Sequence, residues 1–272
     1  MVIGGIGGSG TRMIAKIVAA SGYFLGADLN EAYDNLWFTL LFKRPDVLAL
    51  SAAEFHRRLA ILFKAMVGVA EVTNDDREIV LELASAGCEQ HDPDWLRQRA
   101  ASLMTRAESG SPVGPWGWKE PNSHIVLRPL SEACGKLKFI FVSRHGLDMA
   151  LSSNQNQVRF WGPSLLGEAF EATPRYSLRY WCEAHRRAIA AAGAIGDRFL
   201  FLRYDELCRD KHRELNRLLD FLGVGGRDVA ARASDVIAPP PSIGRSRVVS
   251  LAEFDADDLA YVESLGFAVK NR

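Results

Sequence analysis

The chain lacks several features that define whole classes of proteins. It has no excess of charge, because 33 Lys+Arg residues balance 33 Asp+Glu residues among 272. A balanced charge argues against a general nucleic-acid binder, which normally carries a basic excess, but it leaves room for a local anion site. No apolar run reaches the roughly 18 residues that a helix needs to cross a bilayer, and the N-terminus has no basic segment followed by an apolar one. We therefore expect no nucleic-acid partner, no membrane span and no signal peptide.

Cysteine is scarce as well. Cys88, Cys134, Cys182 and Cys208 are widely spaced, without a Cys-x-x-Cys pair or a His at ligand spacing. This spacing argues against a zinc site and against a disulfide framework. We therefore expect free thiols, no metal and a cytoplasmic protein.

What the chain does have is an alternation of short apolar runs and helical patterns. The runs indicate strands at residues 1–6, 137–143 and 199–203. Apolar residues at helical spacing follow at residues 11–20, 145–154 and 214–222. Buried strands that alternate with helices predict an α/β fold of three layers, α/β/α, around a central parallel sheet. We expect one domain over residues 1–272, with a helical insertion at about 31–108.

The richest motif is IGGIGGSGTR, residues 3–12, which holds five glycines between a strand end and a helix start. Glycines let backbone N–H groups converge on an anion, and a helix N-terminus adds unpaired donors and the positive end of a dipole. We therefore expect a phosphate or sulfate site here, with Arg12 in the first helical turn. The expected backbone donors are Gly7, Gly8, Ser9, Gly10 and Thr11.

The same motif departs from the loop of nucleoside triphosphatases. Gly5 and Gly10 have the required spacing, but Thr11-Arg12 stand where Lys and Ser or Thr should follow. In addition, strand 137–143 is followed by Arg144 and not by an Asp that would help to hold magnesium. A P-loop nucleotide kinase or hydrolase is therefore the weaker alternative.

A second anion site is expected where that strand ends. Arg144 follows the strand, and Ser152 lies eight residues later, about two turns into the helix expected there. A guanidinium offers a fork of donors and a hydroxyl offers one, so the two can converge on a single phosphate.

Together these motifs resemble the sulfotransferases that use 3′-phosphoadenosine 5′-phosphosulfate (PAPS). In that family a loop ending in Ser-Gly-Thr cradles the 5′-phosphosulfate, as residues 9–11 would here, and an Arg and Ser at the spacing of Arg144 and Ser152 hold the 3′-phosphate. The resemblance spans residues 3–245 and implies a P-loop-like fold, PAPS as donor, adenosine 3′,5′-bisphosphate (PAP) as product and no metal.

Two later segments extend the resemblance. Tyr204, within residues 201–224, matches the tyrosine that lines the adenine site of the family. Gly244 and Arg245 follow a run of prolines and are similar to the late loop whose basic residue closes over the 3′-phosphate. The resemblance therefore adds these three residues to the expected donor site.

The resemblance also implies residues that neutralise charge on the transferred group. A short strand with Trp118 leads to Lys119-Glu120-Pro121, which resembles the segment of the tyrosylprotein-type members whose lysine contacts the sulfate. Glu120 could be the ion-pair partner of that lysine. Many members carry a basic residue directly before Ser-Gly-Thr, but Gly8 stands there, so we expect Arg12, with Lys16 one turn further, to supply the charge.

The expected base is a carboxylate. Glu31 matches by position the glutamate base of tyrosylprotein-type and several bacterial members, and Asp28 and Asp34 are close rivals. Ionised Glu can accept a proton at neutral pH, and partial burial would improve it. The competing interpretation is structural, with Asn30 as the N-cap of a helix and Glu31 in its first turn.

The acceptor is open at this point. Residues 154–180 combine polar amides with Phe160, Trp161 and Phe170, and could line an acceptor pocket or belong to the core. The predicted reaction moves a sulfuryl group to a hydroxyl or amine of a small molecule, carbohydrate or peptide. A nucleotide-binding module without activity remains an alternative, and an oligomer is compatible with the sequence.

Overall fold

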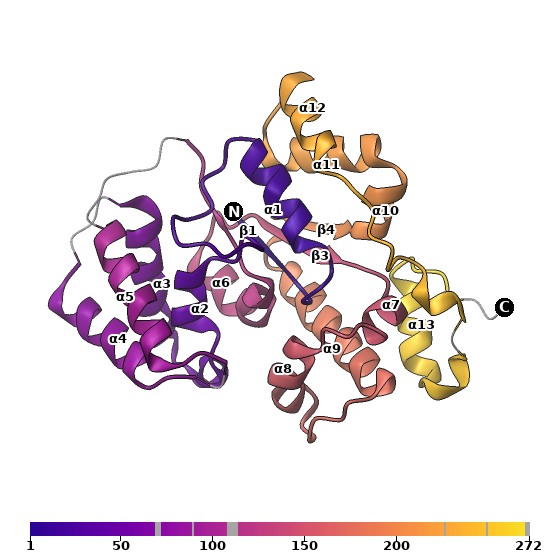
Figure 1. The fold of residues 1–272 in the computed structure, drawn as a ribbon, viewed down its shortest axis with the longest axis horizontal. Helices are drawn as coiled ribbons and strands as arrows, with labels where there is room; N and C mark the ends of the chain where they lie inside the picture. Colours follow the sequence, from indigo (N-terminus) through magenta and orange to yellow (C-terminus); the bar gives the residue numbers. More distant parts are fainter. Residues whose placement is uncertain (69–71, 89, 108–113, 226, 249, 270–272) are drawn as a thin grey trace.

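The structure is a computed structural model that describes residues 1–68, 72–88, 90–107, 114–225, 227–248 and 250–269. Its centre is a parallel four-stranded sheet with helices on both faces (Figure 1). The strands are β1 (Val2–Gly5), β2 (Trp118–Lys119), β3 (Phe139–Ser143) and β4 (Phe199–Arg203), in the order β2-β1-β3-β4. The predicted α/β/α architecture with a parallel sheet is therefore confirmed, whereas the extent of the domain stays a prediction.

The middle strand β3 explains why the sheet is covered on both sides. All five of its residues are buried, and their side chains alternate between the two faces as strand geometry requires. Phe139 and Phe141 belong to one hydrophobic core, and Ile140 and Val142 belong to the other. Two cores of this kind need a helical layer on each face, which makes the apolar run of β3 a signature of the fold.

The helices divide between these two cores. On the side of Ile140 and Val142 lie α1 (Thr11–Ala20), α10 (Tyr204–Arg209), α11 (Lys211–Leu222) and α12 (Arg227–Asp235). On the side of Phe139 and Phe141 lie α6 (Leu127–Ala133), α7 (Gly146–Ala150), α8 (Asn156–Leu166), α9 (Pro174–Ala192) and α13 (Ala256–Ser264). Short 3₁₀ segments lie between these elements, at Pro45–Ala49, Pro121–Val126, Gly196–Arg198, Arg245–Val248 and Leu251–Glu253.

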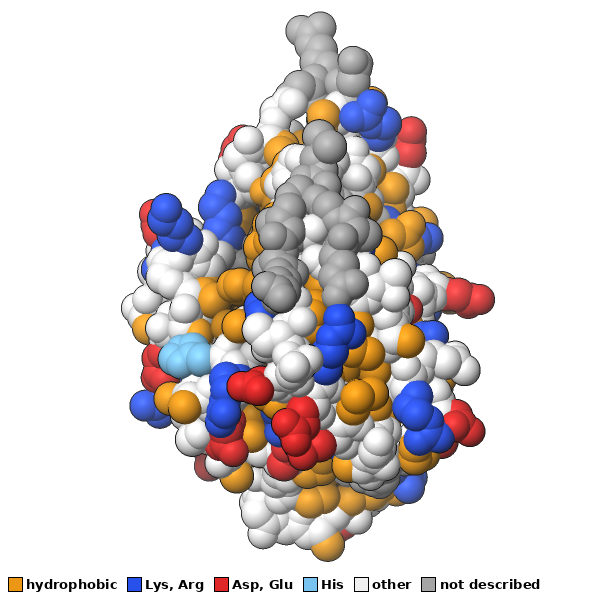
Figure 2. Space-filling model, turned by 90° about the vertical axis from the view of Figure 1, so that its left-hand side faces the viewer, with side chains coloured by type: hydrophobic (Ala, Val, Ile, Leu, Met, Phe, Trp, Pro, Cys, Tyr) orange, Lys and Arg blue, Asp and Glu red, His pale blue; other side chains and the backbone are white. Residues whose placement is uncertain are grey.

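The predicted helical insertion is present and lies to one side of the sheet (Figure 1). Its helices are α2 (Leu36–Phe42), α3 (Ala52–Val67), α4 (Asn74–Ser85) and α5 (Pro93–Ala107). Ser51 and Glu54 form a capping box that begins α3, and Gly68 in a left-handed conformation ends it. Basic and acidic side chains are interspersed on the outer face of the insertion (Figure 2), as expected for a chain without net charge.

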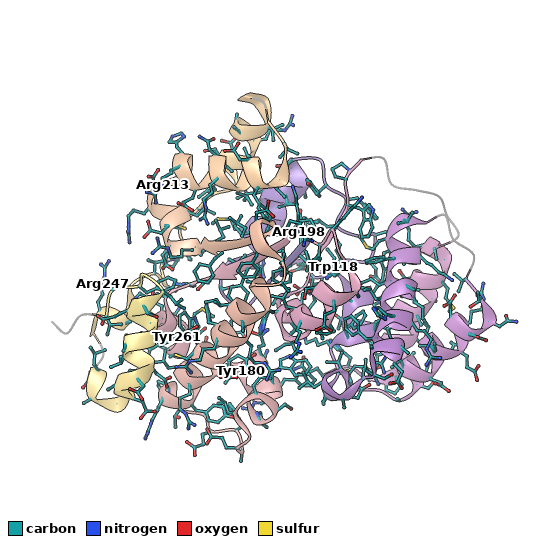
Figure 3. The ribbon with its side chains drawn as sticks, turned by 180° about the vertical axis from the view of Figure 1, so that it is seen from behind. Trp118, Tyr180, Arg198, Arg213, Arg247 and Tyr261 are labelled. Atoms are coloured by element: carbon teal, nitrogen blue, oxygen red, sulfur yellow. The ribbon has the colours of Figure 1, made fainter. Side chains whose placement is uncertain are left out.

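Trp118 joins the insertion to the sheet. Its ring lies 6.0 Å from that of Phe38 and 6.3 Å from that of Phe63, measured between centroids. The side chain is almost fully buried and lies where the strand region meets the helices of the insertion (Figure 3). Because Lys119 is the next residue, this packing fixes the position of the lysine along β1.

Three local predictions from the sequence are wrong in detail. The apolar residues Tyr23–Leu25 predict a short strand, but the structure has only a single bridge there, between Phe24 and Trp116. The pattern over residues 124–134 predicts a helix, but this segment begins as a 3₁₀ turn and becomes α-helical at Leu127. Helix α7 ends at Ala150, so Ser152 lies beyond it and not two turns inside. The side-chain amide of Gln155 donates to the carbonyls of residues 149, 150 and 152, which satisfies the helix end early.

Within the ranges that the structure describes, no helix combines the length and apolar character needed to cross a membrane.

Candidate active site

The glycine loop connects β1 to α1 in a conformation that few other residues could adopt. Gly8 and Gly10 have φ angles of 91° and 101°, in the left-handed region. A methyl group at Gly10 would place its carbon only 2.0 Å from Cδ2 of Tyr204, so the tyrosine ring packs directly on the loop backbone. Glycine is therefore required at position 10 for two reasons: the positive φ angle and the close contact with the Tyr204 ring.

The loop directs only part of its N–H groups outward. The amide of Gly7 donates to Oε1 of Gln157 over 2.7 Å, and the amide of Ser9 donates to the carbonyl of Ile6 over 2.9 Å. Among the described residues, the amides of Gly8, Gly10, Thr11 and Arg12 have no such acceptor. The free donors are thus fewer than the sequence motif suggested, and they cluster at the start of α1, where the helix dipole favours an anion.

Charged side chains at the start of α1 have the same sign. Arg12 and Lys16 are both exposed and lie one turn apart. The first turn of the helix holds no acidic residue, and neither basic side chain forms an ion pair within the described ranges. The N-terminal end of α1 is therefore electropositive.

Arg144 lies close to this loop because the parallel strands β1 and β3 end at the same edge of the sheet. Gly5 pairs with Val142 in the register of the two strands. The guanidinium of Arg144 lies 5.9 Å from the centre of the Tyr204 ring, which itself packs on Gly10. One aromatic ring thus contacts the glycine loop and neighbours the strand-end arginine, so both lie within the reach of one nucleotide.

The environment of Arg144 suits an anion. The residue is 6% exposed, and its Nη2 donates to Oγ of Ser242 over 2.9 Å. Its Nε is buried and has no hydrogen-bond partner in the described part of the chain. A buried guanidinium with an unused donor is costly unless an acceptor completes it, and a phosphate would do so.

The other residues expected at the 3′-phosphate are linked by hydrogen bonds between the late loop and the end of α7; Arg245 also donates from Nε to the carbonyl of Ser242, the residue whose hydroxyl accepts from Arg144. Nη1 of Arg245 donates to the carbonyl of Leu151 over 3.1 Å, directly beside Ser152. The amides of Gly244 and Ser246 donate to the carboxylate of Asp148 on α7. These bonds hold the loop of Gly244 and Arg245 against the turn that carries Ser152.

Lys119 is a buried lysine with two partners. Its side chain is 2% exposed, and Nζ donates to the carbonyl of Ala32 over 3.0 Å and to the carboxylate of Asp34. Glu120 is not its ion-pair partner, because Glu120 continues the extended backbone directly after β2 and successive side chains of extended chain point to opposite sides. The carboxylate of Glu120 instead accepts from the backbone and side-chain amides of Asn122, over 2.6 and 2.7 Å. The ion pair considered from the sequence is therefore replaced by one with Asp34.

The three carboxylates considered as bases differ in their surroundings. Asp34 contacts Lys119, whereas Asp28 lies 3.2 Å from Nε of Arg99. Glu31 is exposed and forms no ion pair with any described residue. The loop that carries them is tight, with Tyr33 at a φ of 64°, the left-handed region that non-glycine residues seldom adopt.

The interpretation of Asn30 as a helix cap is wrong. Its Oδ1 accepts from the amides of Ala32 and Asp34, both over 2.9 Å, and so closes the turn. The helix begins later, at Leu36, with Asn35 as its N-cap. Because the turn around Asn30 lifts Asp34 toward Lys119, its role is to shape the loop.

A buried polar cluster behind the loop was missed by the sequence analysis. Gln157 on α8 lies beside Asn122 and His124 of the segment after β2, at 2.8 and 3.3 Å from its Nε2. Burial raises the pKa of the neighbouring Glu120 to about 7 and lowers the pKa of His124 to about 3. The sequence signal for this cluster is the concentration of amides after Ser152, a pattern that is equally compatible with an acceptor pocket.

Metal ligands do not gather in any described part of the chain: no three His, Cys, Asp or Glu side chains are arranged to hold an ion. The four cysteines are free thiols, as their spacing predicted.

Comparisons with known proteins bear on the family and the fold of the chain. A model of the family described as "Sulfotransferase family" matches residues 1–228. The fold is similar to the sulfotransferase domain of the olefin synthase from Synechococcus PCC 7002, with 17% identity, 99% of this chain and 94% of that chain covered, and a TM-score of 0.53. It is also similar to the sulfotransferase STF9 from Mycobacterium avium, with 16% identity, 100% and 78% covered, and a TM-score of 0.51. No curated protein sequence matches the chain. At these identities the two structures bear on the fold alone.

Proposed function

The chain belongs to the sulfotransferase family, and from that premise we propose that it transfers a sulfuryl group from PAPS to a hydroxyl or amine of an acceptor. The observation that carries the donor assignment is the meeting of two anion-binding groups around Tyr204: the free amides at the start of α1 and the buried guanidinium of Arg144. A ligand with two separate anionic groups on one adenosine matches that arrangement.

The 5′ end of the donor is assigned to the glycine loop. The amides of Gly8, Gly10 and Thr11 supply hydrogen bonds, and Arg12 and the α1 dipole supply positive charge. The amides of Gly7 and Ser9 are already engaged, so their part is to shape the loop.

We assign the 3′ end to four residues, Arg144, Ser152, Gly244 and Arg245. Arg144 offers its unused Nε donor, Ser152 offers a hydroxyl, and Arg245 offers a second guanidinium. Gly244 forms part of the loop that carries Arg245. Charge-assisted hydrogen bonds to a phosphate contribute about 1.5–3 kcal/mol each. The ring of Tyr204 forms the floor between the two ends.

The transfer itself needs positive charge where negative charge develops. Sulfuryl transfer is an in-line displacement at sulfur, similar to phosphoryl transfer, in which charge builds on the bridging oxygen of the leaving group. Lys119 supplies one cation from the end of β2, where it pairs with Ile3 of β1, and Arg12 supplies another from α1. To contact the sulfuryl group, Lys119 exchanges part of its present contact with Asp34 for the donor.

The base is a carboxylate of the loop 28–34. Asp34 is favoured because it contacts Lys119, so an acceptor that approaches the sulfuryl group beside this lysine comes within its reach. Glu31, the choice implied by family resemblance, is exposed on the same loop and is the rival. Asp28 is less well placed because its ion-pair partner is Arg99 of α5 and not the lysine assigned to the sulfuryl group.

Calorimetry with PAP and with ATP tests the proposal. We expect PAP to bind without added metal, and ATP to bind much more weakly whether or not magnesium is present. Binding of ATP that requires magnesium, with no binding of PAP, would instead support a nucleotide kinase or hydrolase. Binding of PAP without PAPS turnover on any of a panel of hydroxyl and amine acceptors would support a module without activity.

A further inference from the structure

We propose that Gln157 is a positioning residue that holds the glycine loop in register with the strand that carries Lys119. The inference rests on the proposed function, because it concerns how the two ends of the same site are kept together. Gln157 contacts no reacting group in this assignment, and acts through the groups to which it is hydrogen-bonded.

The side chain of Gln157 uses both ends of its amide on the loop and the strand segment. Its Oε1 accepts the N–H of Gly7 over 2.7 Å. Its Nε2 donates to Oδ1 of Asn122 over 2.8 Å and lies 3.4 Å from the carbonyl of Gly5. A single amide therefore spans the turn of the glycine loop on one side and the segment after β2 on the other.

Asn122 continues the connection toward the lysine. Its oxygen also accepts from Nε1 of Trp161 over 2.8 Å, and both of its nitrogens donate to the carboxylate of Glu120. Glu120 follows Lys119 directly, and its amide donates to the carbonyl of Ile3 on β1. The path from Gly7 to Lys119 thus runs through three side chains and one peptide unit.

Burial makes this connection rigid and costly to break. Gln157 is 9% exposed, Asn122 5% and Glu120 2%. Breaking a hydrogen bond in such a place leaves a buried polar group without a partner, which costs more than the bond itself contributes. The network therefore restricts the glycine loop and the lysine segment to one relative arrangement, and pre-formed donors of this kind are what stabilise developing charge.

The direction of the Gly7 amide shows what the loop would lose. With Oε1 of Gln157 as acceptor, this N–H points toward the protein interior, and the outward donors are those that follow it. Without that acceptor, the Gly7 peptide is free to turn and the following amides lose their common direction. The effect is specific to the 5′ end, because the hydrogen bonds of Arg144 and Arg245 within the described ranges go to Ser242 and Leu151 and not to Gln157.

The test is a set of nucleotides that separates the two ends of the site. Gln157→Met removes the hydrogen bonds with little change of volume, and Gln98→Met on the exposed face of α5 is the matched control. Binding of PAP, adenosine 5′-monophosphate and adenosine 3′-monophosphate is measured by calorimetry for each protein. We expect Gln157→Met to bind PAP and the 5′-monophosphate about tenfold more weakly, and the 3′-monophosphate as wild type does. The Gln98→Met control should match wild type with all three.

A second variant gives a signature that a packing role would not produce. In Gln157→Glu the charged carboxylate can accept from Gly7 but cannot donate to Asn122, whereas the protonated carboxyl can do both. We expect its affinity for PAP, relative to wild type at each pH, to recover by several fold as the pH falls from about 8 to about 6, because burial raises the pKa of a carboxyl. The same ratio for Gln157→Met should stay constant.

The titratable groups around Gln157 do not obscure this signature. His124, with Arg187 of α9 acting on it, has a pKa lowered by burial to about 3 and stays neutral over this range. Glu120, behind Asn122, has a pKa raised to about 7 by burial, and it titrates in wild type as well, which is why each value is taken as a ratio.

The outcomes separate this inference from the proposed function. If wild type does not bind PAP, the proposed function is wrong and the positioning role falls with it. If wild type binds PAP but Gln157→Met loses affinity for all three nucleotides equally, or for none, the positioning role alone is overturned. If Gln157→Met fails to fold, Gln157→Glu tests the positioning role instead. In that case a ratio of PAP affinities, Gln157→Glu to wild type, that does not change with pH overturns the positioning role.

Discussion

Removing the guanidinium of Arg144 is the sharpest perturbation of the donor site. In Arg144→Ala the side chain that lies beside Tyr204 and donates to Ser242 is lost, while the strand that precedes it is unchanged. Because only the 3′-phosphate is assigned to this side chain, the variant should discriminate between nucleotides that carry this phosphate and those that do not.

The size of the effect follows from the geometry. Arg144 has an unused buried Nε and can offer it to a phosphate together with one Nη. Two charge-assisted hydrogen bonds of about 1.5–3 kcal/mol each, less the cost of giving up the bond to Ser242, leave about 3 kcal/mol, or roughly a hundredfold in affinity. Arg144→Ala should therefore bind PAP about a hundredfold more weakly than wild type does.

The assay compares PAP with adenosine 5′-monophosphate by calorimetry. The 5′-monophosphate should bind to Arg144→Ala as it does to wild type, so that the preference for PAP largely disappears. Arg128→Ala, which removes an 83% exposed side chain on α6, is the control and should keep the wild-type preference. An unchanged affinity for PAP, or an equal loss for both nucleotides, would refute the assignment of the 3′-phosphate to this residue.

Three further predictions concern the base, the loop and the buried carboxyl. Asp34→Asn should lower the turnover of PAPS at least about a hundredfold while the affinity for PAP changes little. Glu31→Gln should keep turnover within about threefold of wild type. Turnover is measured with a radiolabelled donor, and the reverse ranking of the two variants would make Glu31 the base. Gly10→Ala should lower the free energy of unfolding by about 3 kcal/mol or more, because the added Cβ would lie 2.0 Å from the ring of Tyr204. In the control Gly135→Ala the added Cβ meets no atom within 4 Å, so the free energy of unfolding should change little. Urea unfolding measures both variants. Burial raises the pKa of Glu120 to about 7, so the folded state holds this proton more tightly than the unfolded state does and is stabilised below the ordinary pKa of 4.5. That advantage is lost as the pH rises through about 7, and the stability of wild type relative to Glu120→Gln should fall by up to about 3 kcal/mol between about pH 5 and 8; a constant difference in thermal unfolding would contradict this.

The parts of the site that were predictable are those coded by local order along the chain. A strand that is followed by glycines and then by a helix places hydrogen-bond donors at the helix N-terminus. A second strand that is followed by Arg144 places a cation at the same edge of the parallel sheet. Neither step needs knowledge of distant contacts, because a parallel sheet brings the carboxyl ends of its strands together. The late loop of Gly244 and Arg245 was found only through resemblance to a family.

The parts that were not predictable depend on contacts between distant segments. Asp34 and Lys119 are 85 residues apart, and only the turn around Asn30 brings them into contact. Gln157 is 150 residues from Gly7, and its importance depends on which face of α8 turns toward the loop. Ser152 was placed inside a helix because nothing in the local pattern showed that Gln155 would satisfy the end of α7 early.

In the proposed site one nucleotide bridges the glycine loop and Arg144, and a crystal structure of the protein with bound PAP tests this directly. We expect the 5′-phosphate at the amides of Gly8, Gly10 and Thr11, and the 3′-phosphate within hydrogen-bond distance of Arg144, Ser152 and Arg245. A structure in which PAP lies away from the glycine loop, or turns its 3′-phosphate to a different part of the surface, would contradict it.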